Sequence, residues 1–350
     1  MGIRMQERVT ATPSKGPAGR PSVVRWAGLG AVFVAVQLYL YGRWIASGNT
    51  TPTKVGPVPL PSYMTVANVL HYILGGIALA VAFWFLLIRP WRRAGHITTE
   101  GLFLLAFVTC FWQDLAANYF HYWVIYNPGW LNLGSWYNFI PGWHGGLANL
   151  QPEPITFFLP MYPTVGFGFV FVASRILRAL ESRRGRPLRG PALFLLAFAL
   201  LGGADFVLEV AWVRLGLYVY PSTIKSLTLF PGHMYQFPVY ESICWGLSWA
   251  GICFAYYRRN DRGETLAETG ASTLTSPARS RTLIRFLAIA AVCNLGYLAY
   301  NVETAVISRQ GGPWPAEFTK RPYLTYLCSE KDPYACPPGV DPAVGTGTQK

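Results

Sequence analysis

The chain has 350 residues, of which 52% are hydrophobic and only 13% are charged, and its formal net charge is +13. A soluble domain carries about 25% charged residues, so this composition excludes the ordinary soluble class. Several apolar runs reach the roughly 20 residues that a helix needs to cross a bilayer. We therefore expect an all-α, polytopic helical membrane protein, whose positive charge lies in loops and does not indicate nucleic-acid binding.

The apolar runs predict seven transmembrane helices. In chain order they cover residues 23–45, 64–88, 101–125, 155–180, 191–213, 239–257 and 283–307. Together they form one domain over residues 23–309, with long outer loops at 126–154 and 214–237.

The two ends of the chain differ from this domain in composition. Residues 1–22 are polar and basic, so we expect a disordered tail. Residues 310–350 form a Pro-rich tail that contains Cys328 and Cys336. These two cysteines are the plausible disulfide pair if the tail lies in an oxidising compartment. The other cysteines fall in apolar runs and are expected in the core: Cys110, Cys244, Cys253 and Cys293.

The basic residues predict the orientation in the membrane. Most of the 29 Lys and Arg lie in the amino-terminal tail and in the segments 89–93, 175–189 and 258–285. These segments all fall on one side of the predicted seven-helix topology. Because cytoplasmic loops carry the excess of Lys and Arg, we place the amino terminus in the cytoplasm and the carboxyl terminus outside.

The stretch from Phe111 to Pro160 has an unusual composition. It contains no Lys or Arg, yet it holds Asp114, His121, His144 and Glu153 among many aromatic residues. Asp114, Asn118 and His121 are spaced i, i+4 and i+7, which places them on one face of a helix. The rest is rich in Gly, Pro and Asn, so we expect a folded loop.

Acidic residues are predicted to gather at one depth, in the outer half of the membrane. They come from several spans and one outer loop: Asp114, Glu153, Asp205, Glu209, Glu241 and Glu303. His71, His121, His144 and His233 are expected at the same level. Ionisable groups inside a membrane are costly and face the bundle interior. This convergence is the main functional signal in the sequence.

Each of these residues also has a structural interpretation. Asp205 and Glu209 share a helix face and could pair with Arg214 or Lys225. The group around Asp114 could be an interhelical hydrogen-bond network. Glu303 could simply be solvated, and His71 could be a core residue.

The sequence lacks the common motifs of a di-iron site and of a retinal-binding protein. The predicted spans contain no HxxH, HxxxH or ExxH pair, so the ligand spacing of a di-iron or desaturase site is absent. A zinc site built from separate helices stays open. No predicted span carries an interior Lys, which excludes a retinal Schiff base.

Four segments together resemble the AveC-like spirocyclase family of avermectin-type polyketide biosynthesis. They are WQDLAANYFHYWVIYNPG, GSWYNFIPGWHG, QPEP and FPGHMYQFPVYESICWG, and the resemblance covers roughly residues 25–310. It implies closure of a dihydroxy-ketone polyketide to a 6,6-spiroketal, with dehydration of the product in some members. It implies no cofactor, an apolar small-molecule substrate and a bacterial cytoplasmic membrane.

Spiroketal formation requires an acid, a base and a group that stabilises an oxocarbenium ion. We assign these roles to Asp114, Glu241 and Glu209, and we expect His121, His233 and Tyr235 to orient groups or relay protons. The side chains expected to bind the substrate are Asn118, Tyr122, Trp143, His144, Glu153, Asp205 and Tyr235. The second hypothesis is a transporter or binding protein for an apolar or anionic solute, with the acids as a proton relay. A third is a non-catalytic partner in an envelope complex.

Overall fold

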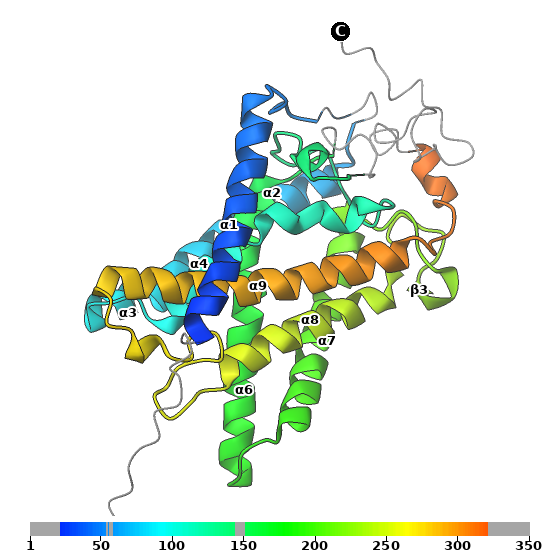
Figure 1. The fold of residues 1–350 in the computed structure, drawn as a ribbon. Coiled ribbons are helices and arrows are strands. Elements are labelled where there is room, and N and C mark those ends of the chain that lie inside the picture. The colour runs from blue at the N-terminus through cyan, green and yellow to red at the C-terminus, as the bar shows by residue number, and fades with distance from the viewer. Residues whose placement is uncertain (1–21, 54, 56–58, 144–150, 321–350) are drawn as a thin grey trace, which may run out of the picture.

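A computed structural model describes residues 22–53, 55, 59–143 and 151–320 (Figure 1). The predicted disordered tail therefore lies almost wholly outside the described residues. His144, Cys328 and Cys336 lie outside them as well. The four cysteines of the apolar runs are buried and free, as predicted.

The structure is mostly helical. Its α-helices are α1 (Ser22–Ala46), α2 (Ser62–Ala82), α3 (Arg89–Ala94), α4 (Thr99–Val108), α5 (Ile155–Met161), α6 (Gly168–Arg184), α7 (Gly190–Arg214), α8 (Val239–Tyr257) and α9 (Ala278–Ser308). Two π-helical segments, η1 (Phe83–Ile88) and η5 (Tyr162–Phe167), continue α2 into α3 and α5 into α6. The 3-10 helices are η2 (Phe111–Tyr119), η3 (Tyr137–Phe139), η6 (Lys225–Leu227), η7 (Ala271–Thr273) and η8 (Ala316–Lys320). The strands are β1 (Ile125–Tyr126), β2 (Tyr218–Val219), β3 (Thr228–Leu229) and β4 (Phe237–Pro238).

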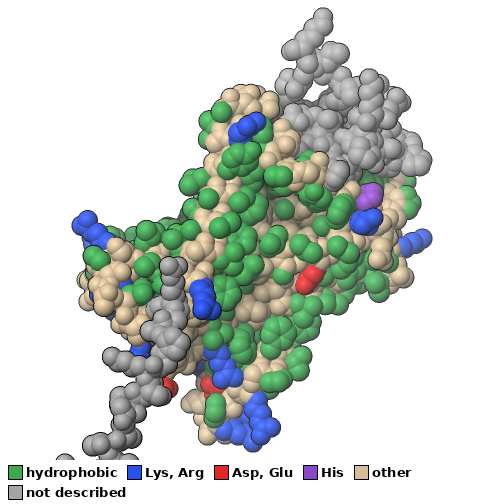
Figure 2. All heavy atoms as spheres, viewed as in Figure 1, with side chains coloured by type: hydrophobic (Ala, Val, Ile, Leu, Met, Phe, Trp, Pro, Cys, Tyr) green, Lys and Arg blue, Asp and Glu red, His purple; other side chains and the backbone are tan. Residues whose placement is uncertain are grey.

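Five helices in the described part of the chain are long and apolar enough to cross a membrane. They are α1, the continuous helix Ser62–Ala94, the continuous helix Ile155–Arg184, α7 and α9. α8 has the bounds of the predicted sixth span but is not one of these five. Hydrophobic side chains cover the middle of the face seen in Figure 2, and most Lys and Arg lie near its edges.

The prediction of one continuous helix over residues 101–125 is wrong. α4 ends at Val108, and the chain continues as the 3-10 helix η2. Near the end of η2, the Asn118 side chain accepts hydrogen bonds from the backbone N–H groups of Trp123 (2.7 Å) and Val124 (3.0 Å), which follow this helix. It also donates to the Val124 carbonyl at 2.8 Å. A side chain that bonds the following backbone in this way competes with a regular helix.

α8 lies inside the bundle. It packs against α6, α7 and α9, and most of its residues are buried. Its contact with α7 is close because glycines face each other. A Cβ atom on Gly246 would lie 2.9 Å from the Cα of Gly202, so neither position has room for a side chain. Small residues at such crossings let two helix backbones approach closely. The approach brings Asp205, three residues after Gly202, next to Glu241 of α8.

Backbone hydrogen bonds join the loop after η2 to the loop after α7. Both loops lie at the end of the bundle away from α3 and from the turn between α6 and α7 (Figure 1). β1 and β2 are antiparallel, with Ile125 opposite Val219 and Tyr126 opposite Tyr218. Asn127 adds a side-chain hydrogen bond to the Gly216 carbonyl at 2.7 Å. The loop after η2 and the loop after α7 thus form one unit that covers this end of the bundle.

Candidate active site

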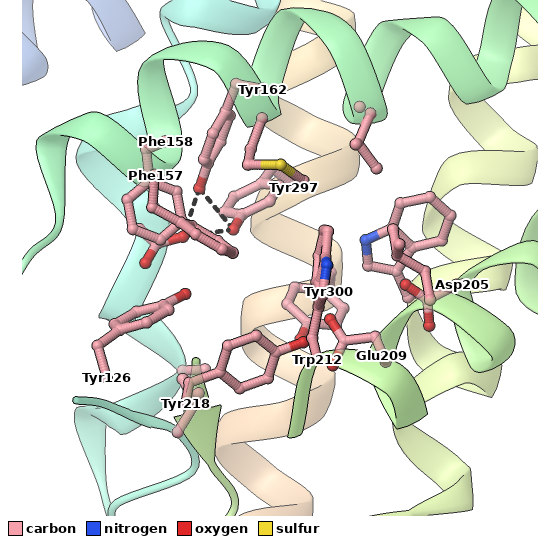
Figure 3. Close-up of a pocket in the computed structure, with 18 of the residues that line it drawn as sticks. Tyr126, Phe157, Phe158, Tyr162, Asp205, Glu209, Trp212, Tyr218, Tyr297 and Tyr300 are labelled. Atoms are coloured by element: carbon pink, nitrogen blue, oxygen red, sulfur yellow. Dashed lines mark hydrogen bonds between the residues drawn. The ribbon is translucent and has the colours of Figure 1, made fainter. Parts of the chain in front are cut away.

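A cavity of about 100 Å³ lies beneath these loops, between η2, η5, α7, α8 and α9 (Figure 3). Three carboxyl groups line it, those of Asp114, Asp205 and Glu209. Six tyrosines line it as well: Tyr126, Tyr162, Tyr218, Tyr220, Tyr297 and Tyr300. Half of the remaining lining residues are Phe or Trp. The cavity is thus an aromatic chamber with acids at two ends.

The first end holds a pair of buried carboxyl groups. Asp114 Oδ1 accepts hydrogen bonds from the hydroxyls of Tyr162 (2.7 Å) and Tyr297 (3.1 Å), which Figure 3 shows converging. Glu153 Oε2 accepts one from Tyr137 at 3.0 Å. Asp114 Oδ2 and Glu153 Oε1 are buried without another donor in the described part of the chain, and the two carboxyl groups interact directly. Two carboxyl oxygens can bond only if one carries a proton, so the pair shares one.

The electrostatics of the pair indicate which member is charged. Both residues lie outside the five long apolar helices. Burial raises the pKa of Asp114 to about 7, because a low-dielectric environment disfavours the carboxylate. Burial, together with the charge of Asp114, raises the pKa of Glu153 well above its usual range. Since Asp114 receives two phenol donors and Glu153 one, we assign the shared proton to Glu153 and the carboxylate to Asp114.

The second end holds Asp205, Glu209 and Glu241. Each offers one oxygen, and these oxygens lie within 4.8 Å of one another. The Tyr220 hydroxyl donates to Glu209 Oε2 at 2.6 Å, and the Tyr300 hydroxyl donates to Glu241 Oε1 at 3.0 Å. Asp205 Oδ2 is buried with no donor among the described residues. Glu241 is fully buried behind the two acids that line the cavity.

Among the residues that the structure describes, no Lys or Arg forms an ion pair with these five acids. The ion pairs in the described chain involve other acids, namely Glu100, Glu268 and Glu317. Arg214, a possible partner of Asp205, instead lies over the Tyr235 ring at 3.8 Å. Five unpaired buried charges would be too costly, so most of these groups must be protonated or must bind a cation. The three oxygens of the second end could hold Mg²⁺ or Mn²⁺, which prefer carboxylate ligands.

His121, His233 and Tyr235 lie outside the cavity. His233 is 48% exposed, accepts or donates a 3.0 Å hydrogen bond with Glu317, and stacks on Tyr235 with ring centres 4.9 Å apart. His121 is exposed, and partial burial together with Arg309 lowers its pKa. None of these three side chains lines the cavity. Their assigned roles stay predictions.

Three predicted binding residues support the loops around the cavity. Asn118 is fully buried and bonds the backbone at Trp123 and Val124. Tyr122 belongs to a separate small apolar cluster with Ile125 and others. Trp143 stacks on Tyr137, whose hydroxyl bonds Glu153. These three side chains therefore hold the surrounding loops in place and do not line the cavity themselves.

Sequence reasoning missed the tyrosines. Every acid of the cavity except Asp205 accepts a hydrogen bond from a tyrosine hydroxyl: Tyr137, Tyr162, Tyr220, Tyr297 and Tyr300 are the donors. A usable signal was present, because a buried phenol in an apolar helix needs a partner. Tyr297 and Tyr300 are spaced i, i+3 in α9, which puts them on one face.

The raised pKa of Asp114 predicts a pH-dependent stability. The folded pKa of about 7 exceeds the unfolded value of 3.8, so the folded state binds the proton more tightly. The stabilisation is therefore complete below about pH 4 and is lost as the pH rises through about 7. Glu153 adds an effect of the same sign. Thermal unfolding in detergent at fixed salt should show Tm falling across this window, with a smaller fall in Asp114→Asn. The control is Asp261→Asn, at an exposed acid in the turn after α8, and it should keep the wild-type slope; an equal fall in Asp114→Asn would contradict the assignment.

Comparison with known proteins adds one finding. A family model described as "Spirocyclase AveC-like" matches residues 91–324, which is more than half of the chain. The matched region contains the three acids that line the cavity and the two, Glu153 and Glu241, that interact with them. No curated protein and no solved structure matches the chain.

Proposed function

Since the chain belongs to the AveC-like spirocyclase family, we propose that it closes a dihydroxy-ketone to a spiroketal by general acid/base catalysis without a cofactor. The observation that supports this reaction most is the pair of acid groups that open on one aromatic cavity. Their tyrosine partners and the missing basic residues favour mixed protonation, as a reaction that needs both an acid and a base requires.

The first step uses one acid from each end of the cavity. The first substrate hydroxyl attacks the ketone carbon, and its proton passes to the Asp114 carboxylate. Protonated Glu209 donates to the carbonyl oxygen, which gives a hemiketal. Asp114 is then protonated and Glu209 is a carboxylate. Glu241 and Asp205 lie behind or beside Glu209 and can exchange its proton.

The second step returns the protons. Protonated Asp114 donates to the hemiketal hydroxyl, which leaves as water and produces an oxocarbenium ion. The Glu209 carboxylate and the aromatic faces stabilise this cation. The second hydroxyl then attacks the cation, and its proton goes to Glu209. One water is lost, one C–O bond replaces another, and both acids regain their starting state.

The cavity walls can also control stereochemistry. A chamber bounded by Tyr, Phe and Trp rings allows the second hydroxyl to approach one face of the cation. Uncatalysed cyclisation lacks this constraint. A further dehydration of the product would need an additional base near a C–H bond.

We also propose a location for the enzyme. The five long apolar helices support an integral protein of the bacterial cytoplasmic membrane. If the α4–η2 segment and α8 also cross, the basic segments fall on one side, which supports an amino terminus inside. The cavity then lies in the outer half of the membrane. An apolar substrate can reach it through the lipid.

A direct assay tests this function. Purified protein in detergent, given a synthetic dihydroxy-ketone and no cofactor, should produce a compound lighter by one water, with one stereoisomer in excess. Heat-denatured protein should give only the uncatalysed mixture. Unchanged mass with saturable binding of the compound would favour the transporter hypothesis.

Chelation distinguishes acid/base chemistry from metal chemistry. Treatment with EDTA should leave the rate unchanged, because the proposed steps use only side-chain protons. A loss of activity that Mg²⁺ or Mn²⁺ restores would instead assign Asp205, Glu209 and Glu241 to a metal site.

A further inference from the structure

A second and larger hollow lies on the outer surface of the bundle. It encloses about 690 Å³ between α2, the α5–η5 segment and the end of α7. Its lining is mainly aliphatic and includes no Lys, Arg, Asp or Glu. We call it the α2 groove. On α2 it is bordered by Val66, Leu70 and Leu74, whose side chains are 56%, 51% and 63% exposed. An open, uncharged surface of this kind suits a hydrocarbon chain.

The α2 groove and the acid cavity share a wall. Met161, Val165 and Trp212 line both spaces, so a single layer of side chains separates them. The Trp212 ring packs edge-on against Phe157, at 5.4 Å between ring centres, and against His71 at 5.9 Å. Trp212 and Val165 are only half-buried. Movement of these side chains would join the two spaces.

The sizes of the two spaces complement each other. The acid cavity, at about 100 Å³, is smaller than the roughly 300–1,000 Å³ of ordinary small-molecule sites. It has room for the reacting dihydroxy-ketone core, but not for a long hydrocarbon chain attached to that core. The adjoining groove supplies apolar volume on the side that faces lipid.

We propose that the α2 groove binds the apolar chain of the substrate and admits its reacting end from the membrane past Trp212. This inference rests on the proposed spirocyclase function. It specifies the substrate class: an uncharged ketone diol with a long hydrocarbon chain. A carboxylate or phosphate at the chain end would fit this groove less well, because its lining among the described residues contains no Lys or Arg to pair with the charge.

Filling the groove tests the inference. Ala78 and Ala80 are both exposed on α2, but only Ala78 lines the groove. Ala78→Trp should raise KM at least tenfold for a dihydroxy-ketone with a long alkyl chain and leave KM unchanged for the bare core compound. Ala80→Trp is the matched control and should change neither. Equal effects of Ala78→Trp on both compounds, or no effect on either, would overturn the inference.

A binding readout separates this inference from the proposed function. A long-chain alkyl ketone without hydroxyls cannot cyclise, and a diazirine at its chain end permits crosslinking. The label should map to the groove residues Leu70 and Leu74, and excess long-chain dihydroxy-ketone should reduce it. Groove labelling without any cyclisation would refute the spirocyclase alone. Cyclisation with labelling elsewhere, or competition by diacyl phospholipid but not by the ketone diol, would refute the groove.

Discussion

Asp114→Asn is expected to lower kcat/KM for cyclisation by about 10²–10⁴-fold, the usual contribution of a positioned base. The amide keeps the size of the side chain and can still meet the hydroxyls of Tyr162 and Tyr297. It cannot accept the proton of the attacking hydroxyl. The rate is measured by mass spectrometry on detergent-purified protein at substrate concentrations well below KM.

The control for this variant is Asp261→Asn. Asp261 is an exposed acid in the turn after α8 and does not line the cavity. It should keep the wild-type rate. If a thermal unfolding transition shows that Asp114→Asn is folded and the variant retains full activity, Asp114 is not the base.

Glu209→Gln should have the second large effect, again about 10²–10⁴-fold on kcat/KM. The amide cannot donate a proton to the ketone oxygen, and it offers no negative charge to the oxocarbenium ion. The loss should therefore appear mainly in kcat, since both interactions belong to the transition state. Steady-state kinetics with the short core compound, whose chain does not use the α2 groove, gives the cleanest measurement.

Comparing Glu241→Gln with Glu209→Gln tests whether the acid that lines the cavity, Glu209, matters more than Glu241 behind it. Glu241 does not line the cavity, so its amide should cost less than that of Glu209. Tyr220→Phe, which removes the 2.6 Å bond to Glu209, tests the surrounding hydrogen bonds without removing an acid. A larger loss in Glu241→Gln than in Glu209→Gln would reverse the assigned roles.

The long helices were predictable because apolar runs define them. α1, α7 and α8 begin and end within one or two residues of the predicted bounds, and α9 begins a few residues early. The exception is the segment after Val108. Its composition is apolar enough for a span, but its polar residues bond their own backbone, and hydropathy does not record that competition.

The positions of the acids along the apolar runs predicted that several acids lie close to one another. They did not predict which acid contacts which. The sequence places Asp114 and Glu153 at one level, but only the tertiary structure shows that they interact, while Asp205 meets Glu241. The tyrosines escaped notice because an aromatic residue in an apolar run is as compatible with core packing as with a site. His233 is predicted at the same level, yet its side chain is half exposed, since a predicted depth does not tell whether a side chain points into the bundle.

The glycine contact between α7 and α8 has a consequence for chain length. The contact of Gly202 with Gly246 fixes how the two helices are rotated and how far each is shifted along its axis. Asp205 follows Gly202 by three residues, and Glu241 precedes Gly246 by five. One inserted residue in either interval turns the helix beyond it by about 100°. It would point an acid away from the cavity while leaving the helix long enough to cross the membrane. Insertions and deletions should therefore be tolerated in the segment between α1 and α2 and not in these two intervals, whatever residue is inserted.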